Sequence, residues 1–268
     1  MDVHHVPTTT GRLAVHTAGA GLPLVLLHAF PLDHAMWERQ APLAAQLRLL
    51  VPDLRGFGGS GGSTPESMAG LADDVAAVLD AVHVGEPAVI CGVSMGGYVA
   101  QHLAVRHPDK VAAVVLVDTK LEADSDEART GRADLAAKVG RLGTGILADA
   151  MVPRLLGTSA AARAEPERSR LEFFLREMIA RQSVPTVQAA LAALGARPDM
   201  TAAMSRVRQP TLLVVGAEDM ITPPDCLERA ERLMPDARLL IVPEAGHLVP
   251  LEQPQVFNAA VVEFLREA

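Results

Sequence analysis

The sequence predicts an α/β fold in which a mostly parallel sheet is covered by helices on both faces. Three observations support this prediction. Short apolar runs alternate along the chain with segments of helical periodicity, which is typical of successive strand–helix units. A G-x-S-x-G motif at residues 92–96 stands between one such run and one such helical segment. One interval, residues 122–208, breaks the alternation and holds only helical patterns separated by Gly and Pro.

The elements follow one another at short intervals. Eight apolar or alternating runs predict strands at residues 3–6, 13–17, 23–27, 47–51, 88–91, 111–117, 211–215 and 238–242. Helical spacing predicts helices near residues 34–45, 67–82, 95–106, 224–234 and 252–267. We expect residues 122–208, inserted after the sixth strand, to form a helical cap over the strand ends, where open α/β sheets bind ligands. Residues 1–121 and 209–268 then form the core domain.

Composition excludes several classes of function. A chain of 268 residues that is 49% hydrophobic can fill one large α/β core. The formal net charge of −8, without a run of Lys and Arg, argues against a nucleic-acid partner. No apolar stretch approaches a membrane span and no signal-peptide pattern opens the chain, so we expect a cytoplasmic protein without a membrane partner. The two cysteines lie in unrelated segments, which favours free thiols.

The motif at residues 92–96 has the context of a nucleophile elbow, a sharp strand-to-helix turn that exposes a serine. An apolar run precedes Ser94 and a helical pattern follows it. The same motif occurs at residues 58–62 around Ser60, but there it lies in a glycine run followed by Pro65, with no helix directly behind it. We therefore interpret Ser60 as part of a flexible loop and Ser94 as the candidate nucleophile.

No cofactor is predicted. Residues 56–61 match the dinucleotide motif G-x-G-x-x-G, yet that motif must open a helix at once, and here Pro65 intervenes. The sequence also lacks a His-Glu-x-x-His pattern, a paired-cysteine motif and a P-loop, so neither a metal nor a nucleotide is expected.

A serine hydroxyl needs a histidine base that a carboxylate holds in place, and behind an elbow the chain order is Ser, acid, His. His247 is the only histidine well beyond the helix that follows Ser94. Asp219 and Asp118 each follow a predicted strand and could supply the acid. Position favours Asp219, because its strand should neighbour the strand that leads to His247. Glu218 is a third, weaker candidate.

The oxyanion that forms during acyl transfer needs two backbone N–H donors, one from the residue after the nucleophile and one from an earlier strand-end loop. Met95 supplies the first. In the loop at residues 28–31, Phe30 can supply the second, whereas Pro31 has no N–H. His28 precedes the elbow in the chain, so we interpret it as a residue that braces this loop.

Apolar side chains of the loop and the cap are candidates for the substrate pocket: Phe30, Trp37, Leu155, Phe173, Phe174 and Leu248. The insertion also carries arginines at positions 154, 170 and 176. An apolar acyl group and an anionic one are therefore both compatible with the sequence.

The chain resembles the α/β-hydrolase superfamily in four motifs, taken in order: HAFPLD at 28–33, DLRGFGGS at 53–60, GVSMGG at 92–97, and GAED at 216–219 with EAGH at 244–247. It is most similar to small bacterial enzymes that include 3-oxoadipate enol-lactonases, arylesterases with perhydrolase activity and cofactor-free haloperoxidases. One departure is Ala29, where the family usually has a glycine, and it matters if that position needs a positive φ. Serine at position 94 disfavours the related haloalkane dehalogenases and epoxide hydrolases.

The resemblance implies a serine hydrolase that cleaves a small carboxylic ester or lactone through an acyl-enzyme, without a cofactor. Two alternatives stay open. The same side chains can serve perhydrolysis, in which hydrogen peroxide replaces water, and the fold can also serve a ligand-binding protein that hardly turns over.

Overall fold

A central sheet organises the molecule. The computed structural model describes residues 1–82, 85–158 and 166–267. Its strands are β1 (Asp2–Thr8), β2 (Gly11–Ala18), β3 (Pro23–Leu27), β4 (Arg48–Pro52), β5 (Gly61–Gly62), β6 (Ala88–Val93), β7 (Val111–Val117), β8 (Thr211–Gly216) and β9 (Ala237–Val242). Eight of them lie in the order β1-β2-β4-β3-β6-β7-β8-β9, and β5 pairs with β2. The strands from β4 through β9 in this order are parallel, whereas β2 is antiparallel to both of its neighbours.

The predicted α/β class and the mostly parallel eight-stranded sheet are confirmed. The additional strand β5 consists of two glycines, which carry no strand propensity for a sequence pattern to detect. The central strands β3, β6 and β8 are buried along their whole length, because helices cover both faces of a parallel sheet and leave no polar side to their strands.

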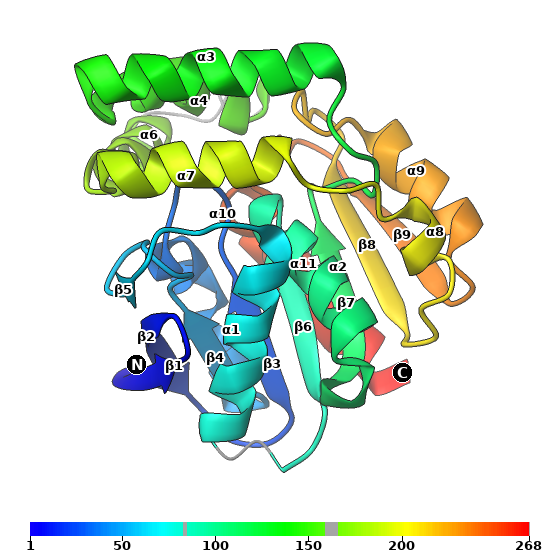
Figure 1. Ribbon diagram of the computed structural model, residues 1–268. Coiled ribbons are helices and arrows are strands. Elements are labelled where there is room, and N and C mark those ends of the chain that lie inside the picture. The colour runs from blue at the N-terminus through cyan, green and yellow to red at the C-terminus, as the bar shows by residue number, and fades with distance from the viewer. Residues whose placement is uncertain (83–84, 159–165, 268) are drawn as a thin grey trace.

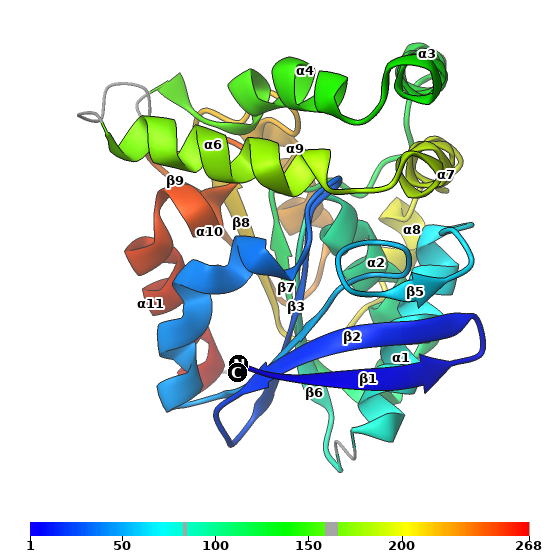
Figure 2. The ribbon, with the colours of Figure 1, turned by 90° about the vertical axis from the view of Figure 1, so that its left-hand side faces the viewer.

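Helices cover both faces of the sheet and its carboxyl edge. They are η1 (His34–Ala45), α1 (Met68–Ala81), α2 (Met95–Arg106), η2 (Pro108–Lys110), α3 (Asp126–Leu142), α4 (Gly145–Leu155), α6 (Glu167–Ala180), α7 (Val184–Gly195), α8 (Thr201–Met204), α9 (Pro224–Leu233), α10 (Val249–Glu252) and α11 (Pro254–Glu267). Figure 2 shows α1 and α2 on one face of the sheet and η1 with α11 on the other.

Two helix predictions differ in detail from the structure. Residues 34–45 form a 3-10 helix that contains Pro42, which has no N–H to donate to a preceding turn. The helix expected at residues 252–267 is divided into α10 and α11 at Gln253, because the residue before a proline, here Pro254, is disfavoured in the helical region.

Four of the helices between β7 and β8 lie across the carboxyl ends of the strands, whereas the short α8 packs beside α2 and α9. We call α3, α4, α6 and α7 the cap helices; Figure 1 shows them above the sheet. α3 packs against α7, and α4 against α6. The loops that follow β3, β6, β7, β8 and β9 therefore lie between the sheet and these helices.

None of the helices in the described ranges is long and apolar enough to cross a membrane.

Candidate active site

Ser94 stands on a strained turn between β6 and α2. Its φ of 52° and ψ of −110° are unusual for a residue with a side chain. The Ser94 N–H donates to the Val117 carbonyl of β7 at 2.9 Å, while the Ser94 carbonyl accepts the N–H of Tyr98 at 3.1 Å. These bonds hold the strained backbone from both sides, and such strain is found most often at functional positions.

The turn can be this sharp only because its neighbours lack side chains. A Cβ atom on Gly92 would lie 2.1 Å from the Gly96 carbonyl oxygen, and one on Gly96 would lie 2.2 Å from the Leu27 carbonyl oxygen. Both distances are far shorter than a van der Waals contact. The glycines of the G-x-S-x-G motif are thus required by the close approach of α2 to β6 and β3.

His247 and Asp219 meet in a buried hydrogen bond. The Nδ1 atom of His247 lies 2.8 Å from Oδ2 of Asp219, and the two side chains are 2% and 0% exposed. The β8 and β9 strands are parallel neighbours, so the loops that carry these residues emerge side by side, as the sequence predicts.

Asp219 is held by its own loop. Its Oδ1 accepts the N–H groups of Ile221 at 2.7 Å and Thr222 at 3.1 Å, and its Oδ2 accepts the Thr222 hydroxyl at 2.6 Å. Burial alone would raise the pKa of Asp219, but His247 and these hydrogen bonds outweigh it and lower the pKa. The carboxylate is thereby kept ionised beside the imidazole. No motif in the sequence pointed to Thr222.

Asp118, the other candidate acid, is directed elsewhere. It is fully buried, and its oxygens accept the N–H of Gly216 at 2.9 Å and of Val249 at 3.1 Å. Burial and the nearby charge of Asp219 raise its pKa well above the ordinary value. Asp118 thus ties β7 to β8 and α10, and His247 bonds to Asp219 instead.

The loop after β3 is braced by a buried neutral imidazole. Nδ1 of His28 lies 3.0 Å from the Ala29 carbonyl oxygen, and its Nε2 accepts the Leu54 N–H at 3.0 Å. Burial lowers the pKa of His28, so the ring can donate on one side and accept on the other. Ala29 does not have a positive φ, so the alanine in place of the usual glycine causes no strain. In the described part of the chain, the N–H groups of Phe30 and Met95 donate to no other backbone group.

A cavity of about 430 Å³ lies between this loop, the acid loop and the cap helices. Its lining combines apolar and charged side chains: Phe30, Tyr98, Lys120, Asp124, Ala128, Gly131, Arg132, Leu135, Met151, Arg154, Leu191, Ile221 and Thr222. Thr222 also bonds to Asp219, so the cavity adjoins the His247–Asp219 pair.

Of the predicted pocket residues, Phe30 lines this cavity. The prediction for Trp37 is wrong: the ring is fully buried against Phe257 of α11, at 6.2 Å between ring centroids. The prediction for Phe173 is also wrong, because this side chain is 65% exposed and lies on the side of α6 opposite the buried stripe of that helix. Phe174 is partly buried against the hydrophobic core.

Two further predicted pocket residues, Leu155 and Leu248, are fully buried outside the cavity lining. Leu155 nevertheless touches the site through its backbone, because its carbonyl accepts the His247 N–H at 3.0 Å. From the same helix α4, Met151 and Arg154 line the cavity instead.

A buried glutamate joins the cap to the histidine loop. Glu252 is 1% exposed; its Oε1 accepts the Gly246 N–H and its Oε2 accepts the Gly157 N–H, each at 2.8 Å. One carboxylate thus fixes the residue before His247 and the segment after α4. Sequence reasoning missed Glu252, since it lies in no motif.

The second G-x-S-x-G match has a structural role. The Ser60 hydroxyl donates to the Asp53 carbonyl at 2.6 Å and accepts the Ala14 N–H at 2.9 Å. The loop is therefore fixed at this residue, and the predicted flexibility was wrong at Ser60. The last two glycines of the glycine-rich segment form β5, and the next helix, α1, begins at Met68, so no helix opens directly behind the motif.

One group of side chains in the described ranges has metal-ligand chemistry: ligand atoms of His16, His34 and Asp53 lie within 4.8 Å of one another. The two rings stack at 3.5 Å between centroids, and a nitrogen of each lies near the Asp53 carboxylate, at 2.8 Å for His34 Nδ1 and 3.6 Å for His16 Nε2. Asp53 also accepts the Gly59 N–H at 2.8 Å. These bonds hold the loop after β4.

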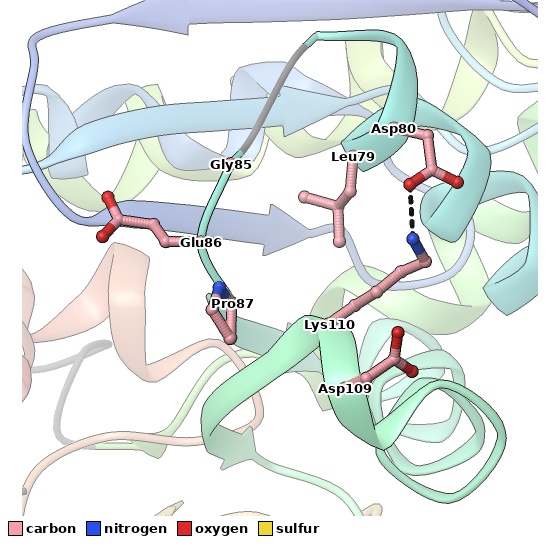
Figure 3. A pocket seen from close by; sticks show the side chains of 7 residues that line it. All are labelled: Leu79, Asp80, Gly85, Glu86, Pro87, Asp109 and Lys110. Atoms are coloured by element: carbon pink, nitrogen blue, oxygen red, sulfur yellow. Dashed lines mark hydrogen bonds and ion pairs between the residues drawn. The ribbon is translucent and has the colours of Figure 1, made fainter.

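Another hollow lies at the opposite edge of the sheet, where β6 and β7 begin. Figure 3 shows Leu79, Asp80 and Lys110 among its lining residues, with the Asp80–Lys110 ion pair across it. Of the catalytic candidates named above, none lines this hollow.

Several known proteins are similar to this chain in sequence or in structure. A pimeloyl-[acyl-carrier protein] methyl ester esterase of Chromobacterium violaceum is 34% identical over 260 residues, covering 95% of this chain and 98% of its own. A thermophilic esterase from Thermogutta terrifontis, solved with malate bound, has a TM-score of 0.93 and 36% identity, covering 100% of this chain and 99% of its own. The enol-lactonase from Burkholderia xenovorans LB400 has a TM-score of 0.90 and 25% identity, covering 98% of this chain and 100% of its own. The family model for the alpha/beta hydrolase fold matches residues 23–254, and the chain therefore belongs to the α/β-hydrolase fold family.

Proposed function

We propose that this protein is a carboxylic ester hydrolase that cleaves a small ester or lactone through an acyl-enzyme on Ser94. The observation that carries the proposal is the buried 2.8 Å bond between His247 and Asp219, on loops at the same sheet edge as the strained Ser94. A serine, a base and an acid in this chain order are the parts that nucleophilic acyl transfer requires.

In the proposed mechanism, Asp219 accepts a hydrogen bond from Nδ1–H of His247 and so holds the tautomer whose Nε2 is free to act as the base. Nε2 takes the Ser94 proton as Oγ attacks the ester carbonyl carbon. The resulting oxyanion is stabilised by the N–H groups of Met95 and Phe30. Protonated His247 then gives its proton to the leaving alkoxide, and the C–O bond breaks.

The second half of the cycle uses the same groups. His247 takes a proton from water, the hydroxide attacks the acyl carbon, and Ser94 Oγ leaves with the proton that His247 returns. For a lactone substrate, the leaving alkoxide stays attached to the acyl group. The names of the relatives, two esterases and an enol-lactonase, support both substrate classes.

Labelling and turnover test the proposal together. The wild-type protein should react with a fluorophosphonate probe and hydrolyse short p-nitrophenyl esters. Ser94→Ala should fold normally, lose the label and lose turnover to the background of the uncatalysed reaction. Ser60→Ala, which alters the second copy of the motif, should still be labelled. Label found on Ser60, or full activity of Ser94→Ala, would refute the proposal.

The same assay with acetate and hydrogen peroxide measures the perhydrolase alternative. Peracid formation faster than ester hydrolysis would reassign the reaction while leaving the roles of Ser94, Asp219 and His247 unchanged.

A further inference from the structure

The cavity beside the proposed catalytic residues has an uneven distribution of charge. Its lining combines apolar residues such as Phe30 with three cations, Lys120 on the segment after β7 and Arg132 and Arg154 on the cap helices. Asp124 is the one acidic residue among the lining residues. An excess of cations is notable here, because the whole chain carries a formal net charge of −8.

Asp124 is already neutralised by other groups. It accepts Nε of Arg132 at 2.5 Å, and Nη2 of Arg197 lies 2.8 Å away. Arg197 is itself buried and lies 4.2 Å over the Tyr98 ring. Burial alone would raise the pKa of Asp124, but the two arginines outweigh it and hold the pKa well below the ordinary value. The carboxylate is therefore ionised and fully engaged.

The other two cations of the lining, Lys120 and Arg154, are paired weakly or, in the described part of the chain, not at all. Lys120 Nζ is 3.6 Å from Asp124, beyond hydrogen-bond distance, and it shares that carboxylate with the two arginines. Arg154 is exposed at the rim on α4, and among the residues that the structure describes it has no ion-pair partner.

We infer that this cavity takes an ester or lactone that carries a carboxylate, and that Arg154 and Lys120 recognise it. The inference rests on the proposed function and names its substrate class. The apolar residues Leu135, Met151 and Leu191 also line the cavity and can contact a short methylene chain between the two groups. Arginine and lysine together can hold an anion by charge-assisted hydrogen bonds, and the carboxylate pairs best with the guanidinium fork.

A matched pair of substrates tests this inference. Monoethyl adipate and ethyl hexanoate have the same chain length and the same ester, and they differ in the terminal carboxylate. We expect the wild-type kcat/KM for monoethyl adipate to exceed that for ethyl hexanoate, and 0.5 M NaCl to reduce this preference by screening the partly exposed charges. An ester of a hydroxy acid, with its carboxylate on the alcohol part, then tells which side of the scissile bond faces the cations.

Variants of single cations distinguish recognition of the carboxylate inside the cavity from a general effect of positive charge on the cap. Arg154→Gln and Lys120→Gln should each lower kcat/KM for the carboxylate ester by about tenfold and change that for ethyl hexanoate by less than about twofold. Arg170→Gln is the control, since it removes one positive charge from the cap at an exposed position outside the cavity lining. It should leave both values unchanged.

Failure of this inference can be told apart from failure of the proposed function. If ethyl hexanoate is hydrolysed but the carboxylate gives no advantage, or if Arg170→Gln has the same effect as Arg154→Gln, the inference is overturned while the proposed function stands. If no ester of either kind is hydrolysed and Ser94 is not labelled, the proposed function itself fails.

Discussion

At the scale of single residues, the site is defined by which carboxylate the imidazole reaches. Asp219 and Asp118 both follow strands of the same sheet, yet only Asp219 bonds to His247, at 2.8 Å. The Asp118 oxygens accept hydrogen bonds from two backbone N–H groups instead. The same substitution, Asp to Asn, should therefore lower the activity at position 219 and the stability at position 118.

Asp219→Asn should lower kcat by about 10³ to 10⁴, because the amide favours the wrong tautomer of His247. Asp118→Asn should reduce the free energy of unfolding by about 1–3 kcal/mol, since one N–H group loses its acceptor, and keep kcat within about tenfold. Steady-state kinetics and urea unfolding of both variants measure this. A larger loss of kcat in Asp118→Asn would reassign the acid.

The Asp53 carboxylate predicts a pH-dependent stability. Burial tends to raise its pKa, but the hydrogen bond from His34 and neighbouring groups lower it from 3.8 to about 2. Because the pKa of Asp53 is lower in the folded than in the unfolded protein, the ionised carboxylate stabilises the folded state at pH values above the unfolded pKa. This stabilisation totals about 2 kcal/mol and is lost as pH falls from about 4 towards 2.

Urea unfolding of wild type and Asp53→Asn between pH 7 and pH 2.5 checks this prediction. The difference in unfolding free energy should grow as pH falls from 7 to about 5, because burial lowers the pKa of His34 but Asp53 outweighs burial and raises it. It should shrink below about pH 4 as Asp53 itself is protonated. Other carboxylates titrate in both proteins and cancel in the difference. A difference that does not change with pH would contradict the role of the ionised carboxylate.

At the level of residues, the sequence led to specific candidates where the topology constrained the choice. His247 followed from chain order, and the pairing with Asp219 followed from the adjacency of β8 and β9, which is now observed. Thr222 and Glu252 were not predictable, because their partners are backbone and side-chain atoms brought together only by the folded loops. The catalytic roles of Ser94, Asp219 and His247 stay predictions.

At the scale of elements, the elbow depends on how closely α2 approaches β3 and β6. Helical and strand periodicity located these elements to within about two residues. Periodicity was less useful on α6, where Leu171, Leu175 and Met178 form the buried stripe and Phe173 points to solvent. An apolar cluster in a sequence does not say which of its members faces a cavity.

Gly96→Ala tests the elbow as an element. The new Cβ would lie 2.2 Å from the backbone carbonyl oxygen of Leu27, so α2 must move away from β3. We expect the free energy of unfolding to fall by about 3 kcal/mol or more, together with loss of fluorophosphonate labelling. Gly131→Ala on the cap helix α3, where a Cβ meets nothing within 4 Å, is the control for stability, and its free energy of unfolding should be unchanged or slightly higher. Equal stability of the two variants would contradict the packing argument.

At the scale of the whole molecule, the cap helices are fastened to the loops at the strand ends. Asp33 is fully buried in the loop after β3 and accepts Nη2 of Arg181 at 2.6 Å and Nε2 of Gln182 at 2.9 Å, both from the segment between α6 and α7. The Glu252 bond to Gly157 fastens a second point. The cap thus contacts the loop that carries Phe30 and the loop that carries His247, so its docking and the geometry of the proposed site are coupled.

Two arginine substitutions in the cap distinguish the effect of losing a contact between cap and core from the effect of losing a surface charge. Arg181→Gln removes a cap-to-core ion pair with a fully buried carboxylate, whereas Arg176→Gln removes an exposed pair with Asp149 inside the cap. Because Arg181 is itself half exposed, we expect its loss to lower the free energy of unfolding by about 1–2 kcal/mol, against about 0.5 kcal/mol or less for Arg176. Looser docking should also raise KM for ester substrates in Arg181→Gln several-fold, with a smaller effect on kcat, since the cap wall of the cavity is less well positioned while Ser94 and His247 stay on the core. Urea unfolding and steady-state kinetics on the same preparations measure both effects, and identical behaviour of the two variants would show that the Asp33 contact does not couple the cap to the site.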